Sequence, residues 1–125
     1  MYILTIEDNF SSAHQLRGYQ GKCENMHGHN WKVILNVKGS SLNSIGLLID
    51  FHDLKEMLKK ICSCYDHVNI NEISPFDEMN PSSENLARII AEAVRKELMQ
   101  KSPALAVHSI TICESDTAKC TYLPE

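Results

Sequence analysis

The chain has 125 residues, a net charge of −4, an apolar fraction of 43% and a charged fraction of 22%. This length and composition predict an ordinary globular protein with one domain over residues 1–125. The acidic balance excludes broad binding to nucleic acid or anionic membranes, and no apolar run reaches the ~20 residues of a membrane span.

The N-terminal segment from Tyr2 to Asp8 alternates as a β-strand does, with Leu4 and Ile6 on one face. It lacks the charged and then apolar pattern of a signal peptide. The chain also carries five cysteines, an odd number that favours reduced thiols over a disulfide framework. Both features predict a cytoplasmic protein.

The next two stretches predict a turn-prone excursion and a second strand. Residues 9–21 contain Ser, Gly, Gln and Arg, and we expect an irregular segment there that carries His14. Residues 27–38 form the clearest predicted strand. Because side chains of a strand alternate between its faces, His27 and His29 should share the face of Trp31 unless a bulge intervenes.

Two amphipathic helices follow. Asp50 is a candidate N-cap for a helix over residues 51–62, where apolar residues recur at three- and four-residue spacing. Residues 65–79 look irregular. Pro81 suits the first turn of a helix. We therefore expect the second helix over residues 81–101, with Asn80 as its N-cap.

Two strands are predicted at the end of the chain, over residues 107–114 and 118–122. The order strand, strand, helix, helix, strand, strand predicts an α+β fold in which two helices cover one face of a four-stranded antiparallel sheet. The other face must meet solvent or a partner. The exposed edges of such a sheet are natural sites for pairing between subunits.

The segment with the most evident chemistry contains a His-x-His pair. His27 and His29 can hold one metal ion, and His14 is available as a third ligand. Neutral imidazole suits zinc, and a catalytic zinc takes three protein ligands and keeps the fourth position open. The alternative for the pair alone is a half-buried strand with two structural histidines.

A closed structural site is the main rival to an open, catalytic one. Cys23 lies close to the pair in sequence and could complete a four-ligand site, in which a saturated zinc activates no substrate. Cys23→Ala would then lose metal and stability together, whereas an enzyme would keep both and lose activity. A cupin or a carbonic anhydrase-like enzyme is a weaker rival, since such strand-rich folds lack two long helices in mid-chain.

Several other positions are candidates for chemistry. Asp66 directly precedes His67, and a carboxylate can orient an imidazole that exchanges protons with a thiol, although an ordinary loop is the alternative. Glu114 either ends a strand in solvent or accepts hydrogen bonds from an aminopyrimidine-like ring. Ser82 and Ser83 either satisfy backbone amides at a helix start or contact a ligand.

Six short segments occur in the following order along the chain: Phe10–His14, Cys23–His29, Asp50–Phe51, Asp66–His67, Pro81–Asn85 and Cys113–Ser115. Together they resemble the 6-pyruvoyl-tetrahydropterin synthase family over nearly the whole chain. The three-residue gap between Cys23 and His27 is similar to that of its bacterial 6-carboxy-tetrahydropterin synthase (QueD) branch. Each alone is modest, but six in family order are specific.

The resemblance implies a single pterin-synthase-like domain with the tunnelling fold (T-fold), in which three sheets close into a barrel and two trimers stack into a homohexamer. Active sites of relatives lie at subunit boundaries. The implied zinc ligands are His14, His27 and His29. The implied proton-transfer group is Cys23, Asp66 and His67. Glu114 would anchor the pterin ring. Ser82 and Ser83 occupy positions where relatives often have threonine.

The implied activity is that of a zinc-dependent lyase. It would convert 7,8-dihydroneopterin triphosphate to 6-carboxy-5,6,7,8-tetrahydropterin on the route to queuosine, with triphosphate and acetaldehyde released and Cys23 as the acid/base. Glu24 leaves another product open, because a related subgroup with the same Cys-Glu-x-x-His-Gly-His pattern is linked to 6-hydroxymethyl-7,8-dihydropterin, a folate precursor. Glu24 could also be a surface charge, and 6-pyruvoyl-tetrahydropterin is a third product.

Overall fold

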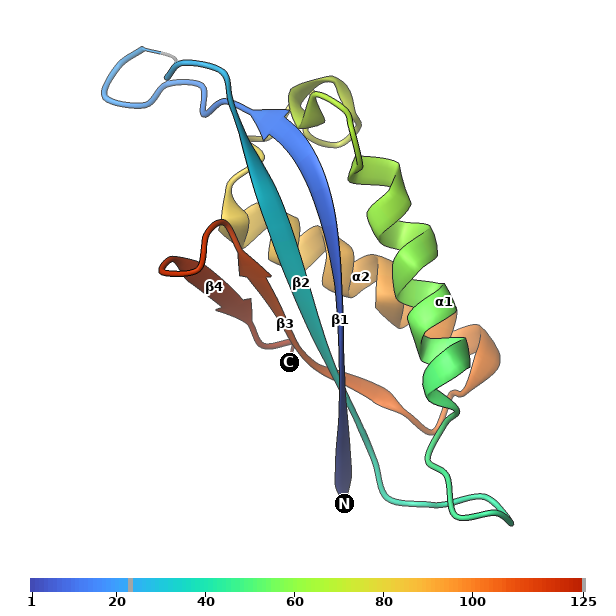
Figure 1. Cartoon of the computed structure of the whole chain (residues 1–125). Coiled ribbons are helices and arrows are strands. Elements are labelled where there is room, and N and C mark those ends of the chain that lie inside the picture. Colours follow the sequence, from blue (N-terminus) through green and yellow to red (C-terminus); the bar gives the residue numbers. More distant parts are fainter. Residues whose placement is uncertain (23, 125) are drawn as a thin grey trace.

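The computed structural model describes residues 1–22 and 24–124 (Figure 1). Cys23, the predicted acid/base, therefore lies outside the described residues, as does Glu125. Two single-turn 3₁₀ helices, Ser63–Tyr65 and Ile70–Glu72, connect the two α-helices. The main elements in chain order are β1 (Tyr2–His14), β2 (His27–Gly39), α1 (Phe51–Cys62), α2 (Ser83–Lys101), β3 (Ala106–Cys113) and β4 (Lys119–Tyr122).

The four strands form one antiparallel sheet in the order β1-β2-β3-β4, and both helices cover the same face of it (Figure 1). The helix α1 packs mainly on β1, and α2 packs on β3 and β4. This is the α+β architecture that the order of predicted elements indicated, so the predicted fold class is confirmed. No helix in the described part of the chain is both long and apolar enough to cross a membrane.

The first strand is longer than its sequence suggests. β1 pairs with β2 without interruption from Tyr2 opposite Gly39 to His14 opposite His27. The expected irregular excursion from Asn9 is therefore wrong for residues 9–14. The serines there have little intrinsic preference for a strand, but pairing with β2 and alternate burial on the core face override that preference.

The core lies between the sheet and the helices. On β2, Trp31, Val33, Leu35 and Val37 are fully buried, and His27 and His29 precede them on the same face. Among the described strands, the only register shift lies in the β2–β3 pairing, between Asn36 and Val37. Because the β1–β2 pairing is regular at the histidines, the predicted sharing of one face is confirmed.

The helix starts are set by side-chain caps. Asp50 caps α1 as predicted, accepting a hydrogen bond from the His52 backbone N–H at 2.8 Å. The second helix starts later than expected, at Ser83, and its N-cap is Ser82, whose hydroxyl accepts from the Asn85 backbone N–H at 3.2 Å. The prediction of Asn80 as the cap is wrong because its side chain bonds to the backbone of Arg17 instead.

The sheet face opposite the helices carries polar side chains that bridge neighbouring strands. Ser11 donates to Asn30 at 2.7 Å, and Asn36 donates to Ser109 at 2.9 Å. Thr111 and Thr121 share a hydrogen bond of 2.7 Å. This face therefore has a connected polar surface rather than a second hydrophobic layer.

Candidate metal centre

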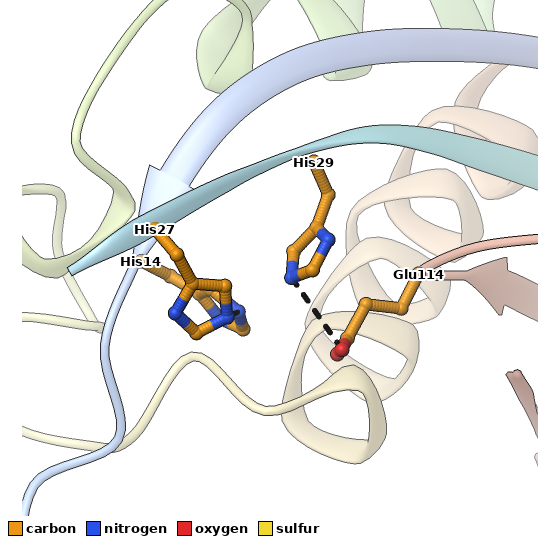
Figure 2. A group of neighbouring side chains, drawn as sticks. All are labelled: His14, His27, His29 and Glu114. Carbon is orange, nitrogen blue, oxygen red and sulfur yellow. Dashed lines mark hydrogen bonds and ion pairs between the residues drawn. The ribbon is translucent and has the colours of Figure 1, made fainter. Parts of the chain in front are cut away.

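Three histidines converge at one end of the sheet (Figure 2). His14 is the last residue of β1 and pairs directly with His27, the first residue of β2, while His29 lies two residues further along the same face. The Nε2 atoms of His14 and His27 are 3.2 Å apart. The ring centroids of the three histidines lie 4.7–5.2 Å from one another. Strand pairing alone therefore assembles the trio that the sequence predicted as metal ligands.

Glu114, directly after β3, joins this group. Its Oε1 lies 3.4 Å from Nε2 of His29 (Figure 2), and its Oε2 accepts a hydrogen bond from the Ser83 hydroxyl at 3.3 Å. One ligand atom from each of the four side chains lies within 4.8 Å of the others. The sequence predicted Glu114 at the end of a strand and left open whether it faces solvent. The β2–β3 register, which brings this carboxylate to His29, could not be read from the sequence.

Backbone carbonyls fix the tautomers of two of the rings. Nδ1 of His14 lies 2.8 Å from the Pro81 carbonyl oxygen, and Nδ1 of His27 lies 2.8 Å from that of Asn25. Because a carbonyl oxygen only accepts, both Nδ1 atoms carry the proton and donate. Both Nε2 atoms then present a lone pair toward the same space, as second-shell carbonyls arrange for metal-ligating histidines.

The third ring also fits a metal ligand. Nε2 of His29 is buried, and none of the described residues forms a hydrogen bond with it. Burial lowers the pKa of His29; Glu114 opposes this shift, and His14 and His27 add to it. A neutral imidazole with a buried and unpartnered nitrogen is the form that zinc binds. The donor set and this nitrogen therefore fit the zinc ion that the resemblance implies.

The Pro81 carbonyl is held in place by contacts between two loops. The Arg17 guanidinium donates to the carbonyl oxygens of Phe76 and Met79, each at 2.8 Å. Asn80 accepts from the Arg17 backbone N–H at 2.8 Å and donates to the Arg17 carbonyl at 2.9 Å. This lock ties the segment before α2 to the chain just after β1, and so orients His14.

Asp66 and His67 form a pair beside β1. Asp66 accepts from the Ser11 backbone N–H at 2.9 Å, and its other oxygen lies 2.9 Å from Nδ1 of His67. The Ser11 N–H, and after it His67, lower the pKa of Asp66. The His67 side chain is 81% exposed, and no hydrogen bond or ion pair among the described residues joins it to the histidine trio. The predicted dyad exists, but the single chain does not bring it to the metal ligands.

His67 also has an unusual backbone conformation. Its φ is 55°, in the left-handed region that few residues other than glycine adopt. Its backbone N–H donates to the Ser11 carbonyl at 2.6 Å, which holds the loop against the strand. A strained, exposed histidine fixed beside a carboxylate is typical of a functional position.

Glu24 lies beside His27, on the Nδ1 side of that ring. Its backbone N–H donates to the Leu16 carbonyl at 3.0 Å, and its carboxylate accepts from the Leu16 N–H at 3.2 Å. The same carboxylate lies 4.0 Å from Nδ1 of His27. Glu24 is therefore tied to Leu16 by two hydrogen bonds, and it is not among the group of four ligand atoms.

The two predicted serine contacts differ. The Ser82 hydroxyl caps α2, whereas the Ser83 hydroxyl bonds to Glu114. Ser83 and Glu114 line a cavity of about 340 Å³ together with Glu84, Ala118, Lys119 and Cys120. Ser83 is therefore placed beside the carboxylate that was predicted to bind a ring, and Ser82 has a local structural role.

Comparisons with known proteins agree with this architecture. The model of the 6-pyruvoyl tetrahydropterin synthase family matches residues 3–125. The chain is 28% identical to the 6-carboxy-5,6,7,8-tetrahydropterin synthase of Haemophilus influenzae, covering 98% of this chain and 99% of that protein. It is 34% identical to the 6-pyruvoyl tetrahydrobiopterin synthase of Dictyostelium discoideum, with 70% and 74% covered.

A solved structure shows the same fold. The 6-pyruvoyl tetrahydropterin synthase of Caenorhabditis elegans superimposes with a TM-score of 0.82 at 28% identity, covering 100% of this chain and 98% of that one. The match over residues 3–125 and the shared architecture lead to one conclusion. The chain belongs to the 6-pyruvoyl tetrahydropterin synthase family of enzymes.

Proposed function

We propose that this enzyme is a zinc-dependent lyase that converts 7,8-dihydroneopterin triphosphate to 6-carboxy-5,6,7,8-tetrahydropterin, releasing triphosphate and acetaldehyde. The observation that carries the proposal is the convergence of His14, His27 and His29. Carbonyls fix two of the tautomers, and the third ring has a buried nitrogen with which none of the described residues forms a hydrogen bond. When bound there, zinc supplies a positive charge that lowers the pKa of nearby substrate hydroxyls and stabilises developing negative charge. Relatives that carry the 6-carboxy-tetrahydropterin synthase name support this product.

Glu114 and Ser83 are the proposed ring-binding residues. The carboxylate lies at the cavity lined by Ser83 and Lys119, where it can accept hydrogen bonds from ring N–H groups. The Ser83 hydroxyl holds one carboxylate oxygen, which limits the directions in which the other can point. Ser82 supports this arrangement by capping the helix that carries Ser83.

Proton transfer is assigned to Cys23 with Asp66 and His67. A free thiol has a pKa of about 8.5, and a nearby cation increases its thiolate fraction near neutrality. The Cys23 thiolate takes a proton from a side-chain carbon of the substrate. Asp66 orients Nδ1 of His67, so that Nε2 of this exposed ring can exchange a proton with a second site on the substrate.

A homohexamer built as a dimer of trimers is the proposed assembly. The sheet has a polar face without a covering layer, and its outer strands β1 and β4 leave edges at which a second subunit can pair. In an assembly with active sites at subunit boundaries, the exposed His67 beside β1 is available to the site of a neighbouring subunit. This accounts for a dyad that has no contact with the trio of its own chain.

A second product, 6-hydroxymethyl-7,8-dihydropterin, is the alternative supported by Glu24. This carboxylate lies 4.0 Å from the His27 ring and directly follows Cys23 in the chain. It is therefore close enough to the proposed site to act as a second acid–base group. Its two bonds to the Leu16 backbone favour a role in holding the loop, so we rank this product, and 6-pyruvoyl-tetrahydropterin, below the first.

The test is mass spectrometry of the products that purified protein forms from 7,8-dihydroneopterin triphosphate, before and after removal of metal. We expect 6-carboxy-tetrahydropterin and acetaldehyde, loss of both on chelation, and recovery with zinc. Glu24→Ala should leave the product unchanged, whereas a hydroxymethyl product that disappears in this variant would establish the alternative. Cys23→Ala should lose activity but keep zinc and fold; loss of zinc and stability would establish a closed structural site.

A further inference from the structure

We propose that Glu114 is the fourth ligand of the metal before a pterin binds, and that the pterin ring withdraws it. The metal and the ring would then compete for one carboxylate, so the fourth position opens only when the ring is in place. This inference rests on the proposed function, and it adds a substrate-controlled opening of the metal site.

The spacing of the ligand atoms carries the first step. A tetrahedral zinc with bonds of about 2.0–2.1 Å has about 3.3–3.4 Å between neighbouring ligand atoms. Nε2 of His14 and of His27 are 3.2 Å apart, and Nε2 of His29 lies 3.4 Å from Oε1 of Glu114. These two pairs contain all four ligand atoms and correspond to two opposite edges of a tetrahedron. One ligand atom from each of the four side chains lies within 4.8 Å of the others.

The chemistry of the group agrees with this geometry. Three neutral imidazoles leave the full charge of a divalent ion uncompensated, and one carboxylate neutralises half of it. Oε1 of Glu114 is aimed at the buried nitrogen of His29, with which no described residue forms a hydrogen bond (Figure 2). A cation between them satisfies both atoms. Carboxylate oxygen is an ordinary zinc ligand beside histidine nitrogen.

The same carboxylate is needed for the ring. Its Oε2 is held by the Ser83 hydroxyl, and the side chain remains 36% exposed at the cavity. A planar pair of ring N–H donors engages both oxygens of a carboxylate, as the guanidinium group does. An oxygen that also bound zinc would accept a weaker hydrogen bond from the ring N–H group. Ring binding therefore weakens the bond from Glu114 to the metal.

The test is the absorption spectrum and the metal affinity of the whole protein. Cobalt(II) replaces zinc and reports the ligands through its visible bands, and zinc affinity is measured by competition with a chromophoric chelator. The variant is Glu114→Gln. The matched control is Glu84→Gln, which changes another carboxylate that lines the same cavity but lies outside the ligand group.

We expect Glu114→Gln to weaken zinc binding by at least ~10-fold, which is the cost of losing an outer-shell partner of a metal ligand. The same variant should shift the visible bands of bound cobalt. Glu84→Gln should change neither the zinc affinity nor the cobalt bands. Unsubstituted pterin, which has no side-chain hydroxyls to bind metal, should move the wild-type cobalt spectrum toward that of Glu114→Gln. It should leave the spectrum of the variant unchanged. Glu114→Ala should reproduce the zinc result, and circular dichroism should show that both variants fold.

Three results would overturn this proposal. They are equal zinc affinity and cobalt spectra for wild type and Glu114→Gln, a cobalt spectrum that pterin does not alter, and an intense near-ultraviolet thiolate band showing that Cys23 is the fourth ligand. The first two leave the proposed function standing, because that function requires only the three histidines. Failure of the proposed function is recognised separately, by zinc binding that survives His27→Ala or by the absence of its products.

Discussion

At the scale of single residues, the sequence predicts the histidine trio but not its fourth neighbour. His27 and His29 share a face because strand side chains alternate, and this follows from their spacing alone. The position of Glu114 beside His29 depends on which residue of β3 lies opposite which residue of β2. Register between distant strands is set by packing of the whole core, so no local pattern could have given it.

The first prediction concerns His14, which is buried and donates to the Pro81 carbonyl. His14→Ala should abolish stable zinc binding, because it removes one of the three proposed nitrogen ligands and the ring that faces His27. Metal content after dialysis, measured by mass spectrometry, checks this. His52→Ala is the control, since His52 lies on the exposed start of α1 and contacts Glu56. Equal zinc retention in both variants would contradict the assignment.

The second prediction concerns the pH dependence that Asp66 confers. The Ser11 N–H and His67 lower the pKa of Asp66 in the folded chain, so the ionised carboxylate stabilises the fold. This contribution is present above the unfolded pKa of about 3.9 and is lost as the pH falls through the lower folded value. The difference in unfolding temperature between wild type and Asp66→Asn should therefore be present at about pH 5 and shrink as the pH falls below about 4. A difference that does not change with pH would contradict this explanation.

At the scale of elements, the helices were the most predictable parts and the loops the least. The apolar spacing of α1 and its Asp50 cap are local signals, and both agree with the structure. The extension of β1 to His14 depends on pairing with β2. Asn80 does not cap α2 because its side chain bonds to the backbone of Arg17, 63 residues away in the chain. Contacts between distant segments decided each of the differences.

The lock between Arg17 and Asn80 leads to the third prediction. Asn80→Ala removes both reciprocal bonds to the Arg17 backbone, and also loosens the Pro81 carbonyl that fixes the His14 tautomer. Zinc affinity should fall by about 10–100-fold, as for other losses of an outer-shell partner. Chelator competition measures this.

The matched control for this variant is Asn43→Ala. The Asn43 side chain likewise makes two hydrogen bonds to the backbone of a loop, accepting from the N–H groups of Ile45 and Leu47. None of the hydrogen bonds of the described residues joins it to the histidine trio. Both variants should lose stability by about 1–2 kcal/mol, at about 1 kcal/mol for each bond. Only Asn80→Ala should weaken zinc binding, so a similar loss of zinc affinity in Asn43→Ala would show that the effect is general destabilisation.

At the scale of the whole molecule, all four candidate ligand atoms come from one chain, whereas no hydrogen bond or ion pair among the described residues joins Asp66 or His67 to them. Metal binding and catalysis should therefore respond differently to loss of assembly. The N-terminal half of β1 is an outer edge of the sheet, and Ile3 on it is 51% exposed. An exposed apolar side chain on an open edge strand is suited to pairing with another subunit.

The fourth prediction follows from this difference. Ile3→Lys places a charge on the edge and should shift the proposed hexamer to smaller species in sedimentation velocity, because charged edge residues oppose strand pairing. Zinc content should remain that of wild type, while formation of the product falls in proportion to the loss of hexamer. Met99→Lys, at an apolar position on α2 that is 61% exposed, is the control and should keep both assembly and activity. An active small species of Ile3→Lys would mean that His67 does not act across a subunit boundary, and that one chain completes its own site.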